Sequence, residues 1–84
     1  MLEELERLTS IPATRWEPYS DDEPHAVFCM WEGRGWRVER VEEDPETWEV
    51  EIRASALGSN QRIGIWSAST MAEAVKLAKE GATP

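Results

Sequence analysis

The sequence predicts a single small α+β domain, in which an antiparallel sheet of three or four strands carries an N-terminal and a C-terminal helix on one face. The strongest observation is the strict alternation of residues 47–54. Trp48, Val50 and Ile52 fall on one side of this segment and charged residues on the other, as in a half-buried strand. Apolar runs before and after it offer partner strands, and 84 residues leave room for one core.

A short helix is expected over residues 2–9. Leu2, Leu5 and Leu8 form one apolar edge, early glutamates suit the positive end of a helix, and Pro12 is expected to end it. So short a helix must dock on an apolar surface. The alternative is that its leucine edge meets a second chain. Residues 12–25, with three prolines, are expected to form a solvated loop.

Four strands are expected, over residues 26–31, 36–41, 48–54 and 62–66. The four-residue loop 32–35 contains two glycines and predicts a hairpin in which Trp31 lies opposite Trp36. The alternation breaks near Arg40, which predicts a bulge or strand end. Residues 42–46 form an acidic turn, after which the strand containing Trp48 pairs antiparallel with the hairpin.

Five tryptophans compensate for the small core that a chain of this size can build. Trp36 and Trp48 share a predicted face with aliphatic residues, which favours burial beneath the helices over a stacking platform for nucleic acid or sugar. Trp31 is expected on the same face. The positions of Trp16 and Trp66 stay open between the core and an exposed anchor in a protein interface.

The last helix is expected over residues 71–80. Thr70 and Glu73 have the spacing of a capping box, and Gly81 is expected to end the helix. Its predicted apolar stripe consists of Met71, Ala74, Val75, Leu77 and Ala78.

The residues that could carry chemistry are few. His25 is the single histidine and is expected at the surface, while Cys29 is the single cysteine and is expected to be an inert core thiol. One cysteine excludes an internal disulfide, and the acidic groups lack the spacing of a calcium loop. An enzyme would need a pocket that joins His25 or Cys29 to the acidic groups. The sequence therefore predicts no enzyme, no catalytic residue, no cofactor and no metal site.

The charge points to a protein partner. Seventeen acidic residues against nine basic ones give a net charge of −8, which disfavours nucleic-acid binding. We expect a non-enzymatic protein-interaction module for a basic surface, with inhibition of a nucleic-acid-handling protein, or mimicry of nucleic acid, as one form of that role. The competing interpretation is that the acidity serves solubility alone. The candidate partner-binding residues are Asp21, Asp22, Glu23, Glu42, Glu43, Asp44, Glu46, Glu49 and Glu51.

The alternative function is nucleic-acid binding through a local arginine patch. Its contacts would be Arg34, Arg37, Arg53 and Arg62. The acidic N-terminus lacks the features of a signal peptide, and no apolar stretch approaches the ~20 residues of a membrane span. A cytoplasmic location is therefore expected, with the chain acting as a monomer or a homodimer.

Overall fold

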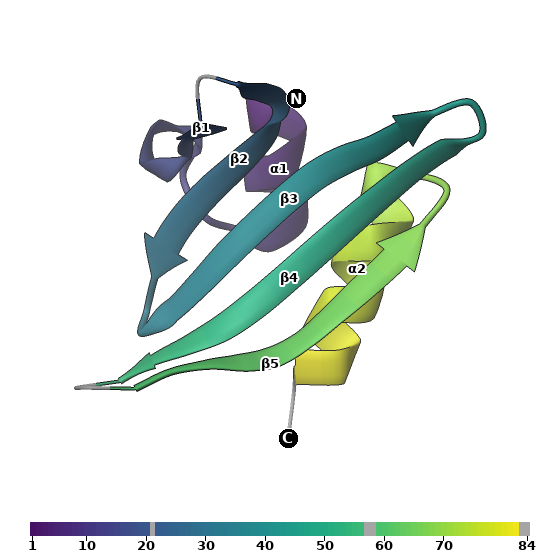
Figure 1. Cartoon of the computed structure of the whole chain (residues 1–84). Coiled ribbons are helices and arrows are strands. Elements are labelled where there is room, and N and C mark those ends of the chain that lie inside the picture. Colours follow the sequence, from purple (N-terminus) through teal and green to yellow (C-terminus); the bar gives the residue numbers. More distant parts are fainter. Residues whose placement is uncertain (21, 57–58, 83–84) are drawn as a thin grey trace.

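The computed structural model describes residues 1–20, 22–56 and 59–82, which form a five-stranded antiparallel sheet with two α-helices on one of its faces (Figure 1). The strands follow one another across the sheet in chain order, β1-β2-β3-β4-β5. This arrangement confirms the predicted fold class. In chain order the elements are α1 (Leu2–Thr9), the 3-10 helix η1 (Ala13–Arg15), β1 (Glu17–Ser20), β2 (Glu23–Trp31), β3 (Arg34–Glu43), β4 (Glu46–Ala56), β5 (Ser59–Ala68) and α2 (Met71–Ala82).

The segment 12–25, predicted as a loop, contains η1, β1 and the start of β2, so that prediction was wrong. β1 pairs Glu17 with Phe28 and Pro18 with Val27, and its register then shifts. Proline is tolerated here because β1 is an edge strand, on which one side of the backbone needs no ladder partner. The short edge strand raises the sheet from the predicted three or four strands to five.

The hairpin of β2 and β3 is tighter than the sequence predicted. Cys29 pairs with Trp36 and Trp31 with Arg34, which leaves a two-residue turn. Glu32 and Gly33 have φ angles of 49° and 79°, the pair of positive values that a type I′ turn requires. The predicted pairing of Trp31 with Trp36 was therefore wrong by two residues. A shift of two leaves every side chain on its predicted face.

The core lies between the sheet and the helices. Trp36, Val38, Val50 and Ile52 are buried on the helix-covered face, and Trp31, Trp48 and Trp66 pack partly buried against the same core. Trp16, which follows η1, is also buried. The bulge expected near Arg40 is confirmed by a register shift between Arg40 and Glu42.

The first helix has the predicted bounds but a different ending. Ser10, not Pro12, ends α1: it takes a left-handed conformation (φ 65°) and donates its backbone N–H to the Glu6 carbonyl oxygen at 2.8 Å. Leu5 is fully buried and Leu8 half-buried, whereas Leu2 is 36% exposed. Most of the leucine edge thus docks onto the domain itself.

In α2, the Thr70 hydroxyl accepts a hydrogen bond from the Glu73 N–H at 3.2 Å, which confirms Thr70 as the N-cap. The helix continues through Gly81 to Ala82, so Gly81 does not end it as predicted. A Cβ atom at Gly81 would lie 2.5 Å from Nε1 of Trp66, and glycine leaves space for that ring. Leu77 is 37% exposed and does not belong to the buried stripe.

Candidate functional site

The face of the sheet opposite the helices carries the charged residues that alternate with the core residues of β3 and β4. Arg37 stands at its centre. Its Nη1 lies 2.7 Å from Oε1 of Glu39, its Nη2 2.9 Å from Oε1 of Glu49, and its Nε 3.6 Å from Oε1 of Glu51. One guanidinium group thus contacts a carboxylate of its own strand and two of the neighbouring strand.

Glu51 joins this cluster to two further arginines. Arg53 Nε lies 3.2 Å from Oε1 of Glu51, and Arg62 Nε lies 2.8 Å from its Oε2. Burial disfavours the charge on Glu51, but the hydrogen bond from Arg53 and the charges of the surrounding arginines hold its pKa below the ordinary value. Burial likewise disfavours the charge on Arg37, yet the hydrogen bond to Glu49 and the neighbouring carboxylates raise its pKa.

We call these residues the charged-face network: Arg37, Arg53, Arg62, Glu39, Glu49 and Glu51. Three positive and three negative side chains cancel formally. Glu49 and Glu51, expected to bind a basic partner, are therefore bonded within the sheet. The alternative arginine patch is likewise divided, because Arg34 lies on the helix side and donates from Nη1 to the Ala82 carbonyl oxygen at 3.3 Å.

Asp22, before β2, and the β3–β4 turn lie at the same end of the sheet. β2 begins where β3 ends, with Ala26 opposite Glu39, so the start of β2 and the β3–β4 turn share that end (Figure 1). Between them, Arg40 Nη2 lies 3.0 Å from Oε1 of Glu43 and 3.3 Å from Nε2 of His25. We call the exposed carboxylates here the acidic end: Asp22, Glu42, Glu43, Asp44 and Glu46. Glu23 is the first residue of β2, and Asp21 lies outside the described residues.

The acidic end keeps an excess of negative charge. Glu43 and Glu46 lie directly opposite each other in the β3–β4 ladder, an unfavourable pairing of like charges. Glu46 also accepts a hydrogen bond from the Trp48 indole N–H at 2.9 Å, which fixes one carboxylate beside the turn. Arg40 offsets a single charge of the five. The arrangement can therefore present several carboxylates at once to a positively charged surface.

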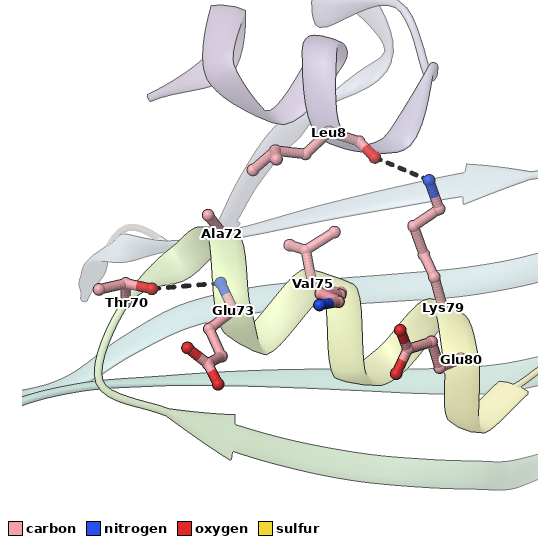
Figure 2. A pocket seen from close by; sticks show the side chains of 8 residues that line it. Leu8, Thr70, Ala72, Glu73, Val75, Lys79 and Glu80 are labelled. Atoms are coloured by element: carbon pink, nitrogen blue, oxygen red, sulfur yellow. Dashed lines mark hydrogen bonds between the residues drawn. The ribbon is translucent and has the colours of Figure 1, made fainter.

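A groove of about 640 Å³ runs between the two helices (Figure 2). Leu8 of α1 and Val75 of α2 contribute apolar surface, and Lys79 joins the two helices by donating from Nζ to the Leu8 carbonyl oxygen at 3.0 Å. Glu73 and Glu80 also line it, so its charges are mixed. A second hollow, of about 470 Å³, lies on the open face between Tyr19, Phe28 and Met30 and the charged-face network.

Neither hollow is lined by His25 or Cys29, although Cys29 lines a smaller one of about 280 Å³ together with Arg15 and Glu17. His25 is exposed on β2 beside Arg40, while Cys29 is 1% exposed and faces the core. Burial raises the pKa of the Cys29 thiol, which keeps it protonated and poorly nucleophilic. Among the described residues, no group of three or more histidine, cysteine, aspartate or glutamate side chains is placed to hold a metal ion.

Two features of the site escaped sequence reasoning. The link between Arg40 and His25 depends on the hairpin register, which was expected two residues away from its true position. The contact of Arg62 with Glu51 depends on a register shift between Ile52 and Arg53, which the local sequence does not predict. The alternation of charged and apolar residues on β3 and β4 was the usable signal, because it puts Arg37, Glu39, Glu49 and Glu51 on one face.

No helix in the described part of the chain is long and apolar enough to cross a membrane. Comparison with protein families, curated proteins and solved structures found no match to this chain. The acidic end and the charged-face network are therefore the features of the molecule that bear on its function.

Proposed function

We propose that this protein is a non-enzymatic interaction module whose acidic end binds a basic surface on another protein. One observation carries the proposal: two turns that are separate in sequence place their exposed carboxylates at the same end of the sheet. The acidic side chains of the charged-face network are bonded to arginines, whereas those of the acidic end project into solvent with a single arginine among them. Exposed charge of one sign steers association with a partner of opposite sign.

The kind of partner follows from the chemistry of carboxylates. A row of negative groups can occupy a groove that otherwise holds a phosphate backbone, so a nucleic-acid-handling protein fits best. The module would then act as an inhibitor or a mimic of nucleic acid, in the cytoplasm. Direct nucleic-acid binding has weaker support, because Arg37, Arg53 and Arg62 are each bonded to Glu51.

The test compares two variants with equal charge. Glu42→Gln/Glu43→Gln/Asp44→Asn removes three negative charges from the acidic end, and Glu3→Gln/Glu6→Gln/Glu80→Gln removes three exposed ones from the helices. Each is used as bait in lysate of the source cells, and bound proteins are identified by mass spectrometry. The proposal expects a basic protein that the wild type and the helix variant capture and the acidic-end variant loses.

Purified partner and chain would then be titrated at several salt concentrations, because binding by exposed charge weakens as salt screens it. Equal capture by all three baits would contradict the proposal. So would a salt-dependent gel shift of DNA or RNA by the chain itself, which would favour the arginine patch.

A further inference from the structure

The two borders of the sheet differ in how they are protected. β1 is four residues long, contains Pro18 and has an irregular register, all of which discourage further strand pairing. β5 is ten residues long and contains neither proline nor lysine. In the part of the chain that the structure describes, no strand pairs with its outer edge (Figure 1). Such an edge presents unpaired N–H and C=O groups to any strand that approaches.

This border is also the part of the chain without negative charge. Between Ile52 and Ala72 there is no aspartate or glutamate, although the chain has 17 in 84 residues. The charged residues in this stretch are Arg53 and Arg62, and both are bonded to Glu51. Two copies with a net charge of −8 each would repel least when they approach through β5.

Exposed apolar side chains lie on β5 itself. Ile65 is 42% exposed and stands opposite Glu51, hence on the open face. Ile63, beside the register shift, is 39% exposed. Both are β-branched residues that pack well between paired strands.

The helix layer adds an apolar residue at the same border. Leu77 and Gly81 are four positions apart in α2 and therefore share a flank. Gly81 packs against Trp66 of β5, whereas Lys76 and Lys79 line the groove towards α1. Leu77, 37% exposed, thus lies on the flank nearest the β5 border.

We propose that a second copy of this chain pairs with β5 through its own β5, antiparallel and about a two-fold axis. The two five-stranded sheets would join into one continuous sheet. A two-fold contact uses the same surface twice, so that surface must complement itself. The β5 border meets this condition because β5 has no acidic residue, its one arginine is bonded to Glu51, and apolar residues lie on both of its faces. The Ile65 side chains of the two copies would pack on the open face and the two Leu77 side chains on the helix face.

Sedimentation velocity between about 1 µM and 1 mM tests the proposal, a range that covers interfaces of modest area. The mass should rise from 9.6 kDa towards twice that value. Ile65→Lys should weaken the dimer at least about tenfold. The matched control, Val41→Lys, alters a 40% exposed residue of β3 and should leave the dimer unchanged. Leu77→Lys should weaken the dimer, and Leu2→Lys of α1 should not.

Hydrogen exchange gives a second measurement that does not depend on a variant folding. Amides of β5 should gain protection as the protein concentration rises, and amides of β1 should not. A monomer at every concentration would overturn the proposal. A dimer lost with Leu2→Lys but kept with Ile65→Lys would also overturn it and place the interface on the leucine edge of α1.

Discussion

Glu51 is 7% exposed and contacts three arginines, so its charge contributes to stability. Glu51→Gln keeps the shape of the side chain and removes the charge. We expect a loss of about 1.5–3 kcal/mol in the free energy of unfolding at neutral pH, the usual worth of hydrogen bonds to charged groups. Urea denaturation of the wild type and the variant measures the difference.

The difference should depend on pH in one direction. The pKa of Glu51 is lower in the folded protein than the ordinary value of about 4.3, so its contribution is complete above that value. It disappears as the pH falls through the folded pKa, and the two denaturation curves should converge in acid. Glu32→Gln, in the exposed β2–β3 turn, is the control and should change nothing. If the difference in unfolding free energy between the wild type and Glu51→Gln stayed constant down to acid pH, it would not come from the charge of Glu51.

Gly81 and Trp66 form a second pair with an effect that can be tested. Alanine is a better helix former than glycine by about 1 kcal/mol, but a Cβ here would meet the indole at 2.5 Å. We expect Gly81→Ala to destabilise the domain by about 1–3 kcal/mol, as overpacking does. In a Trp66→Leu background the same change should stabilise it. Urea denaturation followed by circular dichroism compares the wild type, the two single variants and the double variant. If the two changes had additive effects on the free energy of unfolding, the Trp66 ring would not be what excludes a side chain at position 81.

At the scale of elements, α1 depends on docking, because eight residues do not form a stable helix alone. Leu5 is its fully buried anchor. Leu5→Ala should cost about 2–5 kcal/mol and should raise hydrogen exchange throughout α1. Leu2→Ala, at a residue 36% exposed, should stay within about 0.5 kcal/mol of the wild type. Equal effects of the two changes would mean that α1 is not held by Leu5.

The elements that the sequence predicted well are those with a local signal. Alternation located β4, and leucine spacing located α1. β1 was missed because four residues containing Pro18 carry no strand pattern, and its pairing with β2 is non-local. The β2–β3 turn was misjudged because Glu32 takes a positive φ that its residue type does not predict.

The candidate site likewise has features that follow from local sequence patterns and features that depend on non-local strand pairing. Antiparallel order alone brings the two acidic turns to one end, and the alternation on β3 and β4 places Arg37 among glutamates. The part that could not be foreseen depends on register. Arg62 reaches Glu51 through an irregularity between β4 and β5, and Arg34 turns out to cap α2 on the other side of the sheet.

For the whole molecule, added salt should raise the melting temperature. Raising ionic strength from about 0.01 M to 0.1 M shortens the Debye length from about 30 Å to 10 Å, which screens the exposed carboxylates most. The charged-face network is partly buried and is screened less. In a chain of charge −8, salt should therefore weaken the repulsion between exposed carboxylates more than it weakens the attractions within the network. Each kcal/mol relieved raises the melting temperature by about 4–8 °C. Calorimetry measures the melting temperature at each salt concentration. A lower melting temperature in salt would show that the attractions within the charged-face network outweigh the repulsion between exposed carboxylates.

Opposite charges gather at the two ends of the strands, and this separation acts on a charged molecule before it touches the protein. Carboxylates crowd one end of the sheet, and Arg34, Arg53 and Arg62 lie in the opposite half. The molecule therefore has an electric moment along its strands. A positively charged body at a distance exerts a torque that turns the β3–β4 turn towards it. Collisions would then begin already aligned, and this orientation would fade as ions fill the space between the two molecules.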